Sequence, residues 1–494
     1  MSNQNSETSP AFQQAVAALQ RGDTVAAEEI ITTAAHEARA KYGPGSPEDA
    51  VAQNELGNIL INVGQLPRAI AAYREATSGP WPEDKQAQRD QLTFLMNLGM
   101  ALQWHNQLEE AEEALRRGLK GREDFYGKQH AGYAFGLEPL AEVLLRRGKL
   151  DEAVQLAEEA LRNFWNNGHE RVVTALVLRA EAWKAAKKEG NPLAPAAQLP
   201  DHLLQQLADH VYSRVGRTDV RLSWAVLNDL VPLLEARFGE AHEVTLGALS
   251  VLANVGRGAG EPEARLATIR RFIQACDRWG RPEKALQGVQ GLALALSEAK
   301  QHEAAGAAYR DALQRADRLG DAAQKSQVRR NFGLFLAEQE RRGEAEPKLR
   351  EAVAEAERAR DKEMLGRAEI ALGIFLQHGG KLDEARDFTA RGVSRLAPSH
   401  PDAVSGRSHL KAIESGDSCG CGNTGEAMAE ALREFVLSRV PEGLLDRLEV
   451  KWENNNFAIQ VYLNREPSQQ EVEHLGRIIQ HAQEDFRKRV TQPH

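Results

Sequence analysis

Cysteine is scarce in this chain of 494 residues, which contains only Cys276, Cys419 and Cys421. Three cysteines cannot form the disulfide framework of a small secreted domain. Aromatic residues make up 6% of the sequence, and no run of about 18 apolar residues is present to span a membrane. The first ten residues, MSNQNSETSP, lack the apolar segment of a signal peptide. We therefore expect a soluble protein of the reducing cytoplasm.

Familiar catalytic motifs are also missing. The sequence has no G-x-x-x-x-G-K-[ST] phosphate-binding loop and no H-E-x-x-H zinc motif. Its net charge of −9 argues against nonspecific nucleic-acid binding, which requires a basic face. These absences favour a binding protein over an enzyme, and a protein partner over nucleic acid.

The chain repeats itself every 40 to 42 residues. Segments such as VGQLPRAIA and RGKLDEAVQ align on one anchor residue, which is Gly64 in the first and Gly148 in the second. Alanine follows each anchor by five residues, and alanine or glycine precedes it by seven. Because small residues let helices cross closely, each unit is predicted to be two helices joined by a polar turn. The seven anchors are Gly22, Gly64, Asn106, Gly148, Lys300, Glu340 and Gly380.

This pattern resembles the tetratricopeptide repeat, whose usual length is about 34 residues. The extra length lies in links such as KYGPGSPEDAV and RFGEAHEVTL. Links with an aromatic residue, a glycine and then a histidine are similar to those of kinesin-light-chain repeats. The resemblance covers roughly residues 10 to 415. It implies an all-α fold, a right-handed superhelical array of helix-turn-helix repeats, in which the first helices line a concave wall.

The array is interrupted once. Gly190 would be the next anchor, but GNPLAPAAQLP follows, and its prolines cannot lie within a normal helix. We predict a helix over about 170 to 188 and a restart near Asp201. The break is either a decayed repeat with a surface loop or a hinge between two halves. The predicted organisation is a disordered N-terminus (1–9), a first repeat array (10–190), a proline-rich break (191–200), a second repeat array (201–414), a Gly/Cys linker (415–424) and a C-terminal module (425–494).

Asparagine recurs every fourth residue in one predicted first helix, at Asn54, Asn58 and Asn62. An asparagine amide both donates and accepts, so such a row can hydrogen-bond the backbone of an extended peptide. The resemblance places this row on the concave wall and so implies a peptide-binding groove. The alternatives are a solvated helix face for the asparagines and packing against the next repeat for Trp104. The predicted groove residues are Asn54, Asn58, Asn62, Asn97, Met100, Trp104, Arg330 and Asn331.

The C-terminal module differs from the repeats. It is predicted to be a small α+β unit of order α-β-β-α, with helices over about 425–440 and 468–490 and a hairpin between them. Cys419 and Cys421 precede it in the glycine-rich linker. Two thiols are too few for a closed zinc site. An inert linker, a metal half-site and a redox pair therefore all remain open for these cysteines.

Together these features predict a non-enzymatic scaffold or adaptor that binds a protein or peptide partner in the concave groove. No cofactor is expected, apart from a metal in the event that Cys419 and Cys421 bind one. Two alternatives remain. The first is a metal- or thiol-dependent module that uses the cysteine pair, with the repeats as its docking arm. The second is a self-assembling scaffold that forms homo-oligomers through its C-terminal module.

Overall fold

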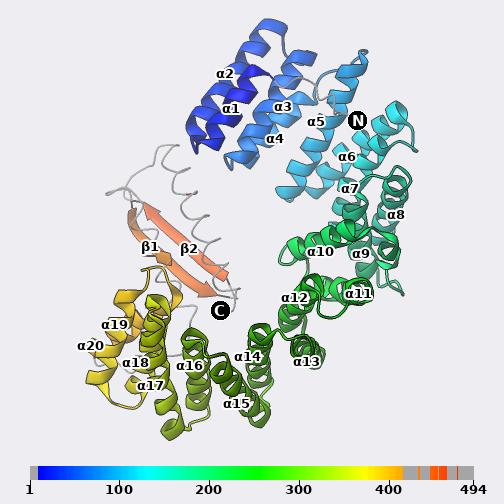
Figure 1. Cartoon of the computed structure of the whole chain (residues 1–494). Coiled ribbons are helices and arrows are strands. Elements are labelled where there is room, and N and C mark those ends of the chain that lie inside the picture. Colours follow the sequence, from blue (N-terminus) through cyan, green and yellow to red (C-terminus); the bar gives the residue numbers. More distant parts are fainter. Residues whose placement is uncertain (1–8, 416–431, 434–444, 454–455, 464–475, 477–494) are drawn as a thin grey trace. The chain divides into compact units, whose positions relative to one another are not determined.

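In a computed structural model of the chain, twenty α-helices, one 3₁₀ helix and a two-stranded sheet make up the described residues (Figure 1). The chain divides into two compact units, residues 1–275 and 276–494. The division therefore falls at Cys276 and not at the predicted proline-rich break. The described residues are 9–415, 432–433, 445–453, 456–463 and 476.

The first unit is entirely helical in its described part. Its helices lie in sequence as antiparallel neighbours, and the last of them, α13, ends three residues beyond the unit boundary. The elements are α1 (Pro10–Gln20), α2 (Thr24–Tyr42), α3 (Pro47–Asn62), α4 (Leu66–Ala76), α5 (Lys85–Trp104), α6 (Leu108–Tyr126), α7 (Ala131–Arg146), α8 (Leu150–Asn166), α9 (Val172–Ala185), η1 (Ala194–Gln198), α10 (Asp201–Arg214), α11 (Val220–Phe238), α12 (Glu243–Ala259) and α13 (Pro262–Arg278).

The second unit continues the helix pairs and ends in the predicted hairpin. Its elements are α14 (Pro282–Glu298), α15 (His302–Leu319), α16 (Ala322–Glu338), α17 (Arg342–Ala359), α18 (Lys362–His378), α19 (Leu382–Arg395), α20 (Pro401–Ser415), β1 (Leu445–Glu453) and β2 (Asn456–Leu463). The two strands pair antiparallel, with Glu453 opposite Asn456. Most of the two predicted flanking helices lies outside the described residues.

Every predicted anchor is a left-handed residue that closes a first helix. Gly64, for example, has φ of +80°, and the N–H that follows it donates to the carbonyl of Leu60 at 2.8 Å. This six-to-one hydrogen bond is the Schellman motif, which turns the chain back sharply. Asn106, Lys300 and Glu340 adopt the same conformation, with φ of 64°, 58° and 59°. The repeat in the sequence is therefore a repeat of helix-ending turns.

The small residues before the anchors give room for large side chains of the second helix. A Cβ on Gly57 would lie 2.5 Å from the Tyr73 ring, and one on Gly333 would lie 2.7 Å from Leu349. The prediction of a small residue on each helix is therefore refined, because the glycine of the first helix meets a large residue of the second. The anchor alanines, such as Ala69, are fully buried beside this contact.

The long links have a common cap structure. Gly127 ends α6 with φ of +74°, and His130 then caps α7 by accepting from the N–H of Gly132 at 2.9 Å. Tyr126, the aromatic residue before the glycine, stacks on the His130 ring with centroids 5.0 Å apart. Phe238 and His242 repeat this arrangement between α11 and α12, with centroids 4.8 Å apart. The aromatic-glycine-histidine link thus sets the entry into the next helix.

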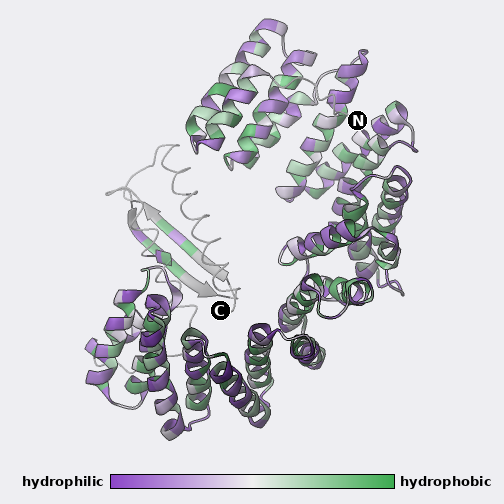
Figure 2. Cartoon of the chain, in the orientation of Figure 1, coloured by the Kyte–Doolittle hydropathy of each residue, from purple (hydrophilic) through white to green (hydrophobic). Residues whose placement is uncertain are grey.

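The core of the first unit is distributed along the array. Buried leucines, alanines and valines of successive helices form elongated clusters, and hydrophobic residues occur along every helix of Figure 2. Helical spacing of apolar residues explains this pattern, because each helix buries one stripe against its neighbours.

The proline-rich break is part of this core. Leu193, Ala196 and Leu199 are buried in it, so the segment is not a surface loop. α9 ends at Ala185 and is followed by the left-handed Lys187, three residues before the expected anchor Gly190. α10 starts at Asp201 as predicted.

Candidate functional site

The first helices of the first unit form a continuous row. α1 contacts α3, α3 contacts α5, α5 contacts α7, and α7 contacts α9, in addition to the contacts that each makes within its own pair. Side chains from neighbouring repeats therefore meet on this row, which we call the first-helix row. Predicted site residues Asn54 to Trp104 all lie on α3 and α5 within it.

Two asparagines join neighbouring repeats on this row. The amide Nδ2 of Asn97 donates to Oδ1 of Asn54 at 2.8 Å. Asn54 is only 8% exposed, so it does not lie on an exposed stripe as expected. The reason is that α5 packs over it and supplies the Asn97 amide. Asn97 itself is half-buried.

The other two asparagines lie further toward solvent. Asn58 is half-buried, and its Oδ1 accepts from the Tyr73 hydroxyl at 2.7 Å. Asn62 is exposed, and its Nδ2 donates to the carbonyl of Asn58 at 2.8 Å. Each side chain is thus fixed by one hydrogen bond from within the chain.

Each of these side-chain amides uses only one of its two polar groups, the carbonyl oxygen or the NH₂ group, in these hydrogen bonds. Among the described residues, Nδ2 of Asn54 and Nδ2 of Asn58 donate to nothing, and Oδ1 of Asn97 accepts from nothing. A backbone amide of an extended peptide needs one acceptor and one donor. The row therefore presents complementary groups on two adjacent helices.

Met100 and Trp104 extend this surface toward the C-terminal end of α5. Met100 is half-buried, and Trp104 is 56% exposed. Packing of Trp104 against the next repeat, the alternative considered from the sequence, would have buried it. An exposed tryptophan has an apolar body and one N–H donor, which suits a binding surface.

An ionic cluster that the sequence did not point to occupies the next part of the row. It consists of Glu138, Glu142, Arg171, Glu181 and Arg214, from α7, α9, α10 and the residue that caps α9. Glu138 and Glu142 lie ten and six residues before anchor Gly148, the places that Asn54 and Asn58 hold before Gly64. Repeat alignment was the signal that could have found them.

Burial controls the charges in this cluster. Arg171 pairs with Glu138 at 2.6 Å, yet burial raises the pKa of Glu138 to about 7. Arg214 bridges Glu181 at 2.6 Å and Glu142 at 3.1 Å, and burial also raises the pKa of Glu181. One carboxylate oxygen each of Glu138 and Glu181 is buried without a hydrogen-bond partner among the described residues.

The two predicted site residues of the second unit lie on α16 and are placed differently. Arg330 is largely buried, and it contacts Oδ1 of Asn331 at 3.2 Å and Asp402 of α20 at 4.0 Å. Arg367 pairs with the same Asp402 at 3.0 Å. Burial and the nearby Arg367 lower the pKa of Arg330 to about 10. The acidic group that these arginines face is thus part of the chain itself.

Cys419 and Cys421 lie outside the described residues. The same linker reads Gly-Asp-Ser-Cys-Gly at 416–420, which fits the G-x-S-x-G pattern that the sequence interpretation overlooked. In hydrolases that motif follows a strand, whereas here the helix α20 ends at Ser415 immediately before it.

No cluster of three metal-binding side chains occurs among the residues that the structure describes. No described helix has the length and apolarity needed to span a membrane.

Comparison with known proteins identifies the repeat. Residues 90–164, from within α5 to within α8, match the family model of the tetratricopeptide repeat. Similar solved structures include the kinesin-light-chain TPR-like repeats of Podosopora anserina, at 16% identity over 48% of this chain and 98% of that chain, with a TM-score of 0.32. The apo form of RapI matches at 13% identity over 59% and 98%, with a TM-score of 0.35.

A third similar structure is BtubC from P. vanneervenii, at 14% identity over 55% of this chain and 93% of that chain, with a TM-score of 0.29. No curated protein matches the chain in sequence. The predicted repeat class is confirmed, and arrays of this class present extended surfaces to protein partners. Residues 90–164 of the chain thus match the tetratricopeptide repeat, and kinesin-light-chain TPR-like repeats are among the similar solved structures.

Proposed function

We propose that this protein is a non-enzymatic scaffold that binds an extended peptide of a partner protein along α3 and α5. The observation that carries the proposal is the Asn54–Asn97 pair. It joins two repeats through one hydrogen bond of 2.8 Å and leaves a donor on Asn54 and an acceptor on Asn97. A peptide strand can use both groups without regard to its side chains.

The neighbouring groups give the peptide a direction and some selectivity. Asn58 adds a second free donor, one helical turn further along α3. Trp104 lies seven residues after Asn97 on the same face of α5 and offers an exposed apolar surface. A large apolar side chain of the peptide packs there, while the amides hold its backbone.

The experiment starts with peptides selected from a random library on the full chain. Their affinity is then measured by fluorescence anisotropy for the wild type, for N58A/N97A and for the control N228A. Asn228 is exposed on α11 and its amide donates to its own helix at 2.8 Å, so the control makes the same chemical change elsewhere.

We expect N58A/N97A to weaken binding about tenfold, because each lost hydrogen bond costs about 0.5–1.5 kcal/mol. N228A should bind as the wild type does. Circular dichroism shows whether the variants are equally folded. If no selected peptide distinguishes N58A/N97A from N228A, the proposal is wrong.

A further inference from the structure

A second surface of the first unit arises from a shortened helix. α4 has 11 residues, whereas α6, the second helix of the next pair, has 19. The chain leaves the helix after Ala76, and Pro80 and Pro82 keep the following segment from continuing it. Residues 77–84 then lead to α5 and leave part of α6 uncovered.

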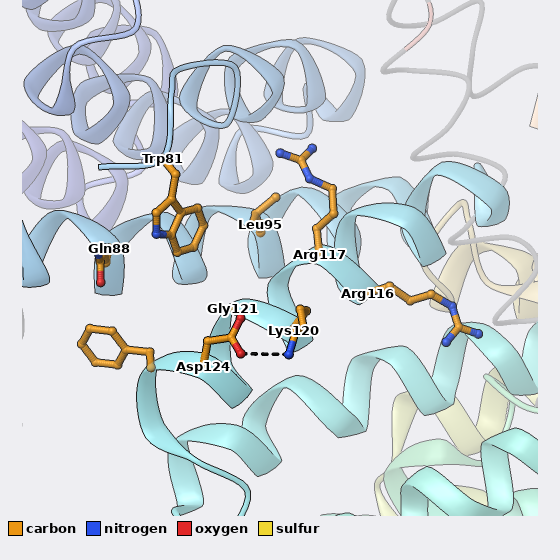
Figure 3. Close-up of a pocket in the computed structure, with 9 residues that line it drawn as sticks. Trp81, Gln88, Leu95, Arg116, Arg117, Lys120, Gly121 and Asp124 are labelled. Atoms are coloured by element: carbon orange, nitrogen blue, oxygen red, sulfur yellow. Dashed lines mark hydrogen bonds and ion pairs between the residues drawn. The ribbon is translucent and has the colours of Figure 1, made fainter. Parts of the chain in front are cut away.

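This segment creates a cavity of about 800 Å³ against α5 and α6, which we call the α6 notch. Figure 3 shows the Trp81 indole and Leu95 side by side over α6, with Arg117 reaching out beside Leu95. Trp81 is 48% exposed, so the notch has a broad apolar wall open to solvent. The notch is lined by Trp81, Gln88, Leu95, Arg117, Lys120 and Gly121, among others.

Gly121 lines the notch and adds no side chain to it. A Cβ on Gly121 would lie 2.5 Å from Leu92 and 3.0 Å from the Trp81 ring, so this position admits no side chain without displacement of both. Glycine inside a helix costs about 0.5–1 kcal/mol relative to alanine. Its place here allows the indole to lie against α6.

Positively charged side chains outnumber negatively charged ones in the notch. Three cations and one anion line it, in a chain whose net charge is −9. Arg116 bonds to Glu152 at 2.8 Å and Lys120 to Asp124 at 2.8 Å. Arg117 has neither an ion-pair nor a hydrogen-bond partner among the described residues. Its guanidinium is therefore available to a carboxylate from outside.

The notch and the proposed peptide surface lie on opposite sides of α5. Leu95 lines the notch, and Asn97 lies on the first-helix row. Residues that are two positions apart in the sequence point in directions about 200° apart around an α-helix. A ligand of the notch therefore does not compete directly with a peptide held by the asparagines.

We propose that the α6 notch binds an acidic segment of a partner protein. A large apolar side chain of that segment packs on Trp81, and a neighbouring carboxylate pairs with Arg117. A protein segment fits better than a small molecule, because a small ligand is normally enclosed over most of its surface and Trp81 is half exposed. The unbalanced positive charge selects an acidic sequence.

The test uses a random peptide library selected on the full chain and then sorted on R117E, W81A and the control R162E. Arg162 is exposed on α8 and lacks a partner among the described residues, so R162E makes the same charge change away from the notch. Affinities of individual peptides are measured by fluorescence anisotropy, and circular dichroism confirms folding of each variant.

We expect a class of peptides rich in Asp or Glu beside a large apolar residue. R117E and W81A should each weaken their binding about tenfold, whereas R162E and N58A/N97A should leave it unchanged. Replacing the acidic residues of the peptide by their amides should weaken binding to the wild type to a similar extent. The proposal is overturned if no selected peptide depends on Arg117, or if the dependent peptides are not acidic.

Discussion

Asn54, Glu138 and Arg330 occupy the same place in three repeats, ten residues before the anchor, but they meet different partners. All three are largely buried. Asn54 accepts a hydrogen bond from a neutral amide, whereas Glu138 and Arg330 face groups of opposite charge. A neutral pair needs no counter-charge, so its remaining donor and acceptor are free for a ligand. A buried charge needs its partner for stability.

A place in the repeat therefore does not by itself define a binding site. Replacing the ionic groups should reduce stability, and replacing the amides should reduce binding.

The largest effect is expected for R214A in the ionic cluster. Arg214 is the cation that pairs with both Glu181, which is 3% exposed, and Glu142. Its loss leaves a buried carboxylate uncompensated, and we expect the free energy of unfolding to fall by about 3 kcal/mol. Urea unfolding followed by circular dichroism measures it.

R237A is the matched control for this change. Arg237 pairs with Asp201 at 2.6 Å, but both side chains are exposed. Exposed pairs contribute about 0–1 kcal/mol, so this variant should unfold near the wild-type midpoint. Equal losses in R214A and R237A would contradict a structural role for the buried cluster.

The pH dependence of stability tests Glu138. Its pKa is about 7 in the folded chain, above its ordinary value of 4.5, because burial and the nearby Glu142 raise the pKa by more than Arg171 lowers it. The folded state therefore holds its proton more tightly, and stability should fall as pH rises from about 4.5 to about 7. E138Q removes this titration.

We expect the stability of the wild type relative to E138Q to fall by about 2 kcal/mol between about pH 5 and about pH 7.5. Urea midpoints of the two proteins across this range give the measurement. Parallel pH profiles would show that Glu138 remains ionised throughout and that its burial has little effect.

Asp402 tests the arginines of the second unit. D402N leaves Arg330 and Arg367 close together without their acidic partner. Because the carboxylate is partly exposed, we expect a loss of about 1 kcal/mol in the stability of this unit. An unchanged thermal midpoint would mean that the pair contributes nothing, and the contrast with the asparagines would weaken.

Much of the fold was predictable because the repeated residues determine the local backbone conformation. The left-handed anchors, the restart at Asp201 and the hairpin all follow from residues close together in the chain. The burial of Asn54 was not predictable in this way, because it depends on Asn97 in the next repeat. The contact of Arg330 with Asp402 was not predictable for the same reason, since Asp402 lies 72 residues further along the chain.

The smallest effect is expected at the turns, which are alike in both units. Glu340 holds the anchor place with φ of +59°, a conformation that glycine adopts without strain. E340G should therefore raise the free energy of unfolding by about 0.5–1 kcal/mol. The same change at the solvent-exposed Glu357, within α17, should lower it. A thermal midpoint below that of the wild type for E340G would contradict the equivalence of the turns.

Hydrogen exchange of the full chain, with and without a selected peptide that depends on Asn97, tests whether a peptide lies along α3 and α5. Mass spectrometry follows the amides of α3, α5, the α6 notch and the second unit separately. We expect slower exchange in peptides covering α3 and α5, around Asn58 and Asn97. Protection confined to α6 or to the second unit, with α3 and α5 unchanged, would contradict it.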